Sequence, residues 1–589
     1  MSSIGRRLPV AALIACLLSA TAVADEDQPT ATANHVRFAE WLDADVGLCL
    51  EVENLGEEWA RFSESRFYQG VVEFPPAAEW LSQHRQGLSL LAGEIERRTG
   101  VTPRELATKL LGRQLLFAIW PPSNPQTDKP RALLLAESTD GQLMRRLLER
   151  LVAARRLAGR WRGRRTVVAG DSTFSIDVVV PDEEQSEFFI TAVGDVAIFA
   201  NDEALLGEIL RRRAAVEPTS LASSPAYLAA AHRLTGGVAA KLFINPRAWD
   251  AALEADLKRK PPGSEEAKSQ AVIVAAWRAI EYVSGGLQLA PQTAVELAWQ
   301  WRPDALPEPV REVAASLAGS CQFVDRLPDD ALIAFAGHAD IRRLIRYGIE
   351  HNGPDDRDPR SQFDSILFWA LAAGVGPDWG GFLKAASDRP PSRSVDLVVG
   401  LQTRPLEAGP QEKPLAETLE PVLHALLSSA VEAVNRQSKV ALASIRSTDH
   451  DGSRITTVLG LLPDRPEQEL AYCVDRLGRL WFGTSAAAIE QASRSSATRT
   501  HAGHPLGDPS GLMRVNLAEW RKLAARGPSA VEFLWEGKQL DARSQEREYQ
   551  TLLAFCRLAD RLVVATRVDE SSVHVSCTLE ANGQGADPK

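Results

Sequence analysis

Six arginines around one tryptophan form the cluster whose residue types and spacing best suit chemistry. They fall within an eleven-residue stretch that contains Trp161, here called the arginine cluster: Arg155, Arg156, Arg160, Arg162, Arg164 and Arg165. A guanidinium can bind phosphate or sulfate through paired hydrogen bonds, and a neighbouring indole offers a stacking surface for a base or a sugar. We therefore predict that Arg160, Arg162, Arg164 and Arg165 bind an anionic surface, such as an envelope polymer or a lipid headgroup. The alternative is structural, because basic residues also favour a helix C-terminus and an exposed strand edge.

Three other stretches contain metal-binding residue types, and each is better interpreted as a loop or a turn. His501 to His504 holds two imidazoles three residues apart, but Gly503 and Pro505 indicate a connecting loop. Asp449 to Ser453 begins like a calcium loop and lacks the acidic residue that closes one, which favours a hairpin turn. The acidic run Asp355 to Asp358 indicates a solvated loop. Since P-loop, nucleophile-elbow, His-Glu-x-x-His and Cys-x-x-Cys patterns are also absent, we predict no catalytic residue, no metal site and no cofactor.

The composition is that of a folded, acidic protein. Of the 589 residues, 45% are apolar and 24% are charged, which is ordinary for globular domains. The length suggests several domains. A formal net charge of −11 disfavours nucleic acid as a partner, because binding it requires a net basic surface.

The first 24 residues are typical of a secretory signal peptide. Arg6 and Arg7 precede the apolar stretch Leu8 to Leu18, and Ala22-Val23-Ala24 is a small-x-small cleavage site. The alternative is a lipoprotein box with lipidation at Cys16. No later stretch is apolar for long enough to span a bilayer, so we predict an exported protein without a transmembrane segment in the mature chain.

Five cysteines follow this leader, and their odd number and wide spacing are unlike a disulfide framework. They are Cys49, Cys321, Cys473, Cys556 and Cys577. We interpret them as small buried apolar side chains. A bridge between Cys556 and Cys577 is left open as the alternative.

A strand, a polar cap and a helix form the unit that organises the chain. In Leu512 to Trp520 the strand ends at Asn516, which can cap a helix, and Glu519 stands where a capping box has its partner. The same unit recurs at Leu242 to Trp249, where Asn245 is the cap. Looser copies, with caps at Asn54 and Asp340, occur at Leu48 to Trp59 and at Leu332 to Leu344.

This recurrence extends over most of the sequence. Elements of the same type return in the same order at offsets of about 264 to 285 positions, and the stretches after Gly100 and Gly374 both indicate helices. We therefore predict an internal duplication. Its parts are a signal peptide (1–24), a flexible leader (25–41), the first half (42–302), a linker with a short helix (303–326), the second half (327–581) and a disordered tail (582–589).

Each half is predicted to be α+β, with largely antiparallel sheets backed by helices. Strand patterns alternate with helical ones, and some strands are separated only by tight turns, as at Gly170-Asp171-Ser172. Together with Leu42-Asp43-Ala44-Asp45 and Leu327-Pro328-Asp329 at the start of each half, this order resembles a family of large secreted bacterial proteins of unknown function. The resemblance implies an exported or envelope protein and supplies no catalytic residues.

The function we expect is that of an exported, non-catalytic binding or structural protein of the bacterial envelope. Its ligand is not indicated by the sequence. The alternative is a secreted hydrolase whose site is assembled only in the fold, and such a site would bring several titratable side chains together in one buried cleft.

Overall fold

The computed structural model describes residues 38–581 with fourteen internal gaps: 123–127, 181–186, 215–218, 235–236, 290–291, 344–374, 387–393, 404–414, 439–441, 451–452, 462–468, 476, 495–505 and 536–539. The chain divides after Leu306 into two compact units, the first unit and the second unit. The boundary lies in the stretch predicted as a linker. This stretch, residues 303–326, contains three short helices: η5 (Pro303–Ala305), α11 (Glu308–Leu317) and η6 (Val324–Arg326).

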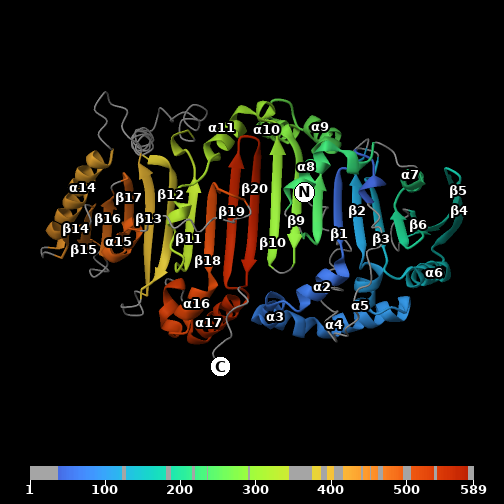
Figure 1. The fold of residues 1–589 in the computed structure, drawn as a ribbon, viewed down its shortest axis with the longest axis horizontal. Coiled ribbons are helices and arrows are strands. Elements are labelled where there is room, and N and C mark those ends of the chain that lie inside the picture. Colours follow the sequence, from blue (N-terminus) through green and yellow to red (C-terminus); the bar gives the residue numbers. More distant parts are fainter. Residues whose placement is uncertain are drawn as a thin grey trace. The chain divides into compact units, whose positions relative to one another are not determined.

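The first unit is built on an antiparallel sheet (Figure 1). The strand order is β4-β5-β6-β7-β3-β2-β1-β8-β9-β10, and every neighbouring pair is antiparallel. The strands are β1 (Leu48–Glu53), β2 (Gln114–Trp120), β3 (Arg131–Glu137), β4 (Trp161–Ala169), β5 (Ser172–Val179), β6 (Phe188–Val193), β7 (Val196–Ala200), β8 (Ala240–Ile244), β9 (Ile280–Gln288) and β10 (Thr293–Trp301).

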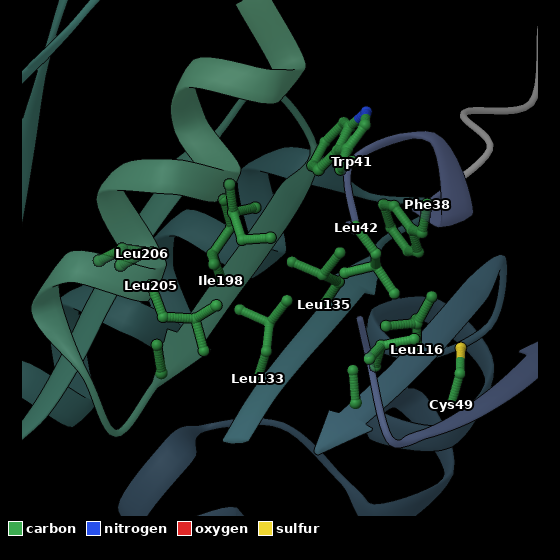
Figure 2. Close-up of a cluster of buried hydrophobic side chains, with 14 of the residues drawn as sticks. Phe38, Trp41, Leu42, Cys49, Leu116, Leu133, Leu135, Ile198, Leu205 and Leu206 are labelled. Atoms are coloured by element: carbon green, nitrogen blue, oxygen red, sulfur yellow. The ribbon is translucent and has the colours of Figure 1, made fainter. Parts of the chain in front are cut away.

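Helices cover both faces of this sheet. One face carries an apolar core to which η1, η3, α7 and α8 contribute, and Figure 2 shows Leu205 and Leu206 of α7 among the strand residues. The other face packs Leu115, Ala136 and Ile190 against Met144 and other residues of α6. Two covered faces explain why buried side chains occur on both sides of the strands. The helices are η1 (Phe38–Glu40), α2 (Leu55–Ser63), α3 (Arg66–Glu73), α4 (Pro75–Thr99), α5 (Pro103–Glu105), the π-helical turn η2 (Leu106–Leu110), α6 (Gly141–Leu157), α7 (Glu203–Ala214), η3 (Leu221–Ser223), α8 (Pro225–Arg233), η4 (Pro246–Trp249), α9 (Asp250–Lys258) and α10 (Glu265–Ala279).

The second unit has a sheet of the same kind. Its strand order is β14-β15-β16-β17-β13-β12-β11-β18-β19-β20, again antiparallel throughout. The strands are β11 (Ile333–His338), β12 (Val375–Ala385), β13 (Val395–Thr403), β14 (Ser444–His450), β15 (Ser453–Leu459), β16 (Glu469–Val474), β17 (Arg479–Gly483), β18 (Gly511–Asn516), β19 (Arg561–Asp569) and β20 (Ser572–Glu580). The helices besides α11 and η6 are α14 (Leu415–Ser438), α15 (Ala486–Arg494), α16 (Leu517–Ala524), η8 (Pro528–Leu534) and α17 (Ala542–Arg557).

The predicted α+β class with antiparallel sheets is therefore confirmed. Among the residues described, no helix combines the length and the apolar character needed to cross a bilayer. The predicted turn at Gly170-Asp171-Ser172 is also confirmed: Ala169 pairs with Ser172 across it, and Gly170 has a positive φ of 59°. The five cysteines from Cys49 onward are free thiols, so the Cys556–Cys577 alternative is wrong.

Both predicted asparagine caps are formed. Asn516 Oδ1 accepts a hydrogen bond from the Glu519 amide at 3.1 Å, and Asn245 Oδ1 accepts one from the Arg247 amide at 3.1 Å. Asn516 opens the α-helix α16, whereas Asn245 opens the 3-10 turn η4, which continues into α9. The Glu519 carboxylate is paired with Lys522, so the capping box has only one of its two hydrogen bonds.

The tryptophan that follows each cap is tied to the strand beside it. Trp520 Nε1 donates to the Leu332 carbonyl at 3.1 Å, and Trp249 Nε1 donates to the Gly47 carbonyl at 3.1 Å. Trp520 is only 4% exposed, while Trp249 is half-buried. Gly47 gives Trp249 its space, because a Cβ on Gly47 would lie 2.8 Å from the indole nitrogen.

Three expectations were wrong. The folded part begins before residue 42, because Phe38 and Trp41 are buried, and 38–41 therefore belong to the fold and not to the leader. Asn54 does not cap with its side chain, because its backbone is left-handed at φ 50°. The stretch after Gly374 is strand β12 and not a helix. A Cβ on Gly381 of this strand would lie 2.5 Å from the Val398 carbonyl oxygen, so a glycine is required there for close packing of the strands.

Candidate functional site

The arginine cluster lies at the end of α6 and along β4 in the first unit. Arg155 and Arg156 are in the last turn of α6, Arg160 follows that helix, and Arg162, Arg164 and Arg165 are exposed on β4. Arg155 and Arg156 therefore stand where the helix dipole favours positive charge, as the structural alternative predicts.

Two of the four predicted binding residues are engaged by carboxylates. Arg164 forms two hydrogen bonds with Asp177, at 3.3 and 2.9 Å, and Arg165 pairs with Glu203 and, at 3.2 Å, with Glu187. These hydrogen bonds raise the pKa of both guanidinium groups. Their charges are largely compensated within the protein, which makes them weaker binding groups for an outside anion than the sequence implied.

Trp161 is half-buried and connects the cluster to the sheet. Its Nε1 donates to Asp177 at 3.0 Å, and the guanidinium carbon of Arg156 lies 4.1 Å from the ring centre. A neighbouring groove of about 410 Å³ is lined by α6 and by β4, β5 and β6, with Arg145 and Glu149 at its rim. This groove contains basic and acidic residues together, so it has no uniform positive charge.

Only one of the three metal-like stretches, Asp449 to Ser453, lies even partly within the described residues. Residues 501–504 and 355–358 lie outside the described residues. The predicted hairpin is supported by β14 and β15, which pair with His450 opposite Ser453. Within the described ranges, no group of three or more His, Cys, Asp or Glu side chains is placed to hold a metal ion.

A second polar cluster, which the sequence did not reveal, lies on β1 of the first unit. Successive strand residues face opposite sides of a sheet, so Cys49, Glu51 and Glu53 share one face. Cys49 belongs to the apolar core beside Leu116 (Figure 2). Glu51 continues that face and is only 5% exposed.

One oxygen of Glu51 is held by neighbouring side chains. Its Oε1 accepts a hydrogen bond of 2.6 Å from the hydroxyl of Tyr227 on α8, and the Cys49 thiol lies 3.7 Å away. The other oxygen, Oε2, makes no hydrogen bond with any residue that the structure describes. A buried carboxyl group is therefore only half satisfied by the protein.

Two ion pairs flank this carboxyl group. Lys241 stands opposite Glu51 in the pairing of β1 with β8, but its ammonium group lies 2.9 Å from Glu53 Oε1. Arg113, directly before β2, lies 3.1 Å from Oε1 of the buried Glu137 on β3. Both cations are thus paired with carboxylates of the protein.

A cavity of about 610 Å³, here called the Glu51 cavity, is lined by these groups except Cys49 and Glu137, and also by His232. Gln114 of β2 lies in its wall at 7% exposure, and its side-chain amide has no hydrogen-bond partner within the described part of the chain. The opposite part of the wall is apolar. It consists of Phe38, Ala39, Ala222, Leu228 and Ala231.

Burial determines the protonation behaviour of the cluster. Desolvation raises the pKa of Glu51, although the Tyr227 hydrogen bond and Lys241 act in the opposite direction. Burial and then the charge of Glu51 raise the pKa values of Tyr227 and Cys49. Tyr227 is therefore a stable hydrogen-bond donor, and the Cys49 thiol is not activated as a nucleophile. Glu51 has the properties of a proton donor or of a hydrogen-bonding group for a ligand.

Asn54 completes the wall where β1 ends. It is the one residue other than glycine with a positive φ among those described, and its amide N–H donates to the Arg113 carbonyl at 2.7 Å. Left-handed backbone is uncommon outside glycine and is best tolerated by asparagine. This conformation turns the chain at the rim of the cavity.

The second unit has an apolar pair at the positions that match Glu51 and Lys241, and a polar pair at those that match Glu53 and Gln114. In the first unit, Glu51 on β1 stands opposite Lys241 on β8. The strands with the same places in the second sheet are β11 and β18, and there Ala336 stands opposite Leu512. Where Glu53 stands opposite Gln114, His338 stands opposite Asp378, and His338 Nδ1 lies 2.7 Å from Asp378 Oδ1. The sheet therefore does not need a buried carboxyl group at the position of Glu51.

The local sequence contains no clear signal for Glu51. In Leu48-Cys49-Leu50-Glu51-Val52-Glu53 the regular alternation places Leu48, Leu50 and Val52 on the apparent core face and the glutamates in solvent. Cys49, two residues before Glu51 and on the same face, is the one local indication that other residues pack on this face of the strand. Tyr227 and Lys241 come from positions more than 170 residues away, and no spacing rule connects them to β1.

No protein-family model, curated protein or solved structure matches this chain. The resemblance to large secreted bacterial proteins therefore remains a prediction.

Proposed function

We propose that this chain is an exported binding protein whose first unit holds a small ligand in the Glu51 cavity. The observation that carries the proposal is that two buried polar side chains, Glu51 and Gln114, have unused hydrogen-bonding groups in the wall of one 610 Å³ cavity. Cavities of this size with a few convergent polar groups are the usual form of a small-molecule site.

The placement of these residues supports a functional role for them. The free oxygen of Glu51 and the amide of Gln114 face the cavity, so a ligand there would replace their hydrogen bonds with water by hydrogen bonds of its own. Each such exchange contributes about 0.5–1.5 kcal/mol. The apolar pair Ala336 and Leu512 in the second unit supports the view that stability alone does not require Glu51 and Lys241.

We also propose that the two units arose by duplication. Their strand orders agree, and the contacts of the two asparagine caps correspond. Asn245 Nδ2 donates to the Ala44 carbonyl and Asn516 Nδ2 to the Asp329 carbonyl, acceptors 285 positions apart. The acceptors of the two tryptophans, Gly47 and Leu332, differ by the same 285 positions. In this proposal the second unit keeps the scaffold and the first unit carries the ligand.

Export to the bacterial envelope is part of the proposal and rests on the signal-peptide pattern of residues 1–24. Binding of the arginine cluster to an anionic polymer or lipid headgroup remains a separate prediction. The pairing of Arg164 and Arg165 with carboxylates counts against these two residues as its main contacts.

A thermal-shift screen tests the binding proposal. A ligand that binds only the folded state raises the unfolding temperature with concentration. We expect a compound that stabilises the wild-type protein and not the Glu51→Leu or Gln114→Leu variants. If stabilising compounds act equally on the wild type and both variants, the Glu51 cavity is not the binding site.

A hydrolase is the second candidate, and the raised pKa of Glu51 favours it. A carboxyl group with a raised pKa can act as a general acid, and Glu53, two residues further along the same face, would be the second carboxylate. This candidate requires turnover of a chromogenic glycoside that disappears in both Glu51→Gln and Glu53→Gln. Binding without turnover favours the first proposal.

A further inference from the structure

We propose that the Glu51 cavity takes a neutral ligand with neighbouring hydroxyl groups, such as a mono- or disaccharide. This inference rests on the proposed binding function and specifies the chemical class of its ligand. It follows from which groups in the wall are already paired and which are not.

The lysine and the arginine in the described wall of the cavity are not available to an anionic ligand, and the other basic side chain there, His232, is exposed. Lys241 is paired with Glu53, and Arg113 is paired with Glu137. An anion would have to compete with these carboxylates and approach Glu51 as well. Like charges at short distance disfavour such a complex.

A cationic ligand is also poorly matched. Lys241 stands opposite Glu51 in the sheet and is already paired with Glu53, so a second ammonium group would have to compete with Lys241 for the carboxyl groups of β1. Burial raises the pKa of Glu51, which means that the protein environment favours the uncharged acid. A new buried ion pair would require the ionised form of Glu51, which burial disfavours.

The unpaired groups instead suit hydroxyl groups. The carboxyl group of Glu51 and the amide of Gln114 each contain oxygen and can donate and accept hydrogen bonds, as a sugar hydroxyl does. Both side chains are more than nine-tenths buried, so the bonds would form away from bulk water. The apolar wall, from Phe38 to Ala231, can cover the C–H face of a sugar ring.

Isothermal titration calorimetry on the full mature chain (residues 25–589) tests this inference. The neutral probes are glucose, galactose, N-acetylglucosamine and trehalose; putrescine is the cationic probe, and gluconate and phosphate are the anionic probes. We expect at least one neutral sugar to bind. Gln114→Leu and Glu51→Leu should each weaken its binding about tenfold or more, as expected for the loss of one buried hydrogen bond.

Two further variants make the result specific. Glu51→Gln keeps hydrogen bonding without the ability to ionise, so it should retain sugar binding within a few-fold, whereas binding of an amine would be lost. Gln83→Leu, on the exposed face of α4, is the matched control and should bind as the wild type does. Circular dichroism confirms that each variant is folded, and Glu51→Gln and Gln114→Leu are compared even if Glu51→Leu does not fold.

The outcomes separate the two proposals. Binding of putrescine, gluconate or phosphate that depends on Glu51, without sugar binding, overturns the ligand class and leaves the binding function in place. Sugar binding that survives both leucine substitutions overturns the assignment to this cavity. If no probe of any class binds, the ligand class and the proposed function are both wrong.

Discussion

Glu51 combines two properties that rarely occur together in a residue kept only for stability. It is 5% exposed, and one of its oxygens has no partner within the described structure. Replacing buried charged or polar groups by apolar ones often stabilises a protein. This combination supports the proposal that Glu51 contacts a ligand.

The raised pKa of Glu51 predicts how stability changes with pH. Between 4.5, the ordinary pKa of glutamate, and its higher pKa in the folded state, the folded protein binds more protons than the unfolded chain. The free energy of unfolding therefore falls as pH rises through this window, by at most about 1.4 kcal/mol per pH unit from this residue. Glu51→Gln lacks this contribution, so its stability relative to the wild type should increase with pH. Urea denaturation from pH 4 to pH 8 measures the difference; a pH-independent difference contradicts the raised pKa.

The arginine cluster leads to a prediction that separates its members. Arg162 is exposed on β4, whereas Arg164 is held by Asp177. If the cluster binds polyanions, Arg162→Gln should elute from a heparin column at clearly lower salt, and Arg164→Gln at nearly the wild-type salt concentration. Both substitutions should change stability by less than about 1 kcal/mol, because exposed ion pairs contribute little. Equal elution of the two variants and the wild type would mean that this stretch is not the binding surface.

Among the elements, those with strong local signals were predicted correctly from the sequence. The periodicity of residues 142–157 predicts a helix, and this stretch is α6 (Gly141–Leu157); the apolar run 132–135 predicts a strand, and it lies within β3. Local capping and regular periodicity are enough for such elements. The strand β12 was missed because its glycines are explained by packing against distant residues and not by local propensity.

The candidate site could not be predicted in the same way. Its members lie on β1, β2, β8 and α8, and their proximity follows from strand pairing across the first unit. The arginine cluster was conspicuous because its residues are adjacent in sequence, and adjacency says nothing about the acidic partners that the fold provides. Asp177 and Glu203 are such partners.

The two cap-and-tryptophan units predict unequal losses of stability. Trp520 is buried and stacks near Phe533, with ring centres 6.1 Å apart, whereas Trp249 is half-buried. Trp520→Ala should cost roughly 3–5 kcal/mol and Trp249→Ala clearly less. Asn245→Ala and Asn516→Ala should each cost about 1 kcal/mol, with the loss of one cap. Denaturant titration of the four variants gives these values, and an equal loss for the two tryptophans would contradict their different burial.

For the whole molecule, export predicts a defined mature chain. The pattern Ala22-Val23-Ala24 places the cleavage before Asp25. Intact-mass analysis of protein from the exported fraction should give a chain that begins at Asp25. A lipid-modified chain that begins at Cys16 would instead support the lipoprotein alternative.

The division of roles between the two units can be tested by exchanging their residues. The double substitution Glu51→Ala and Lys241→Leu gives the first unit the pair found at Ala336 and Leu512. Because the same sheet positions accept apolar residues in the second unit, the variant should fold, with a free energy of unfolding within about 2 kcal/mol of the wild type. Ligand binding should be lost.

The converse substitution, Ala336→Glu, places a carboxyl group opposite Leu512, where strand pairing supplies no lysine. Ala336 is 5% exposed, so the new group would be buried without the partners that Tyr227 and Lys241 provide around Glu51. We expect a loss of at least about 2 kcal/mol that grows as pH rises, since burial penalises the ionised form. Chemical denaturation at pH 5 and pH 8 measures both effects. If Ala336→Glu is tolerated at both values, the second unit accepts a buried carboxyl group as readily as the first, and the retention of Glu51 in the first unit alone would need another explanation.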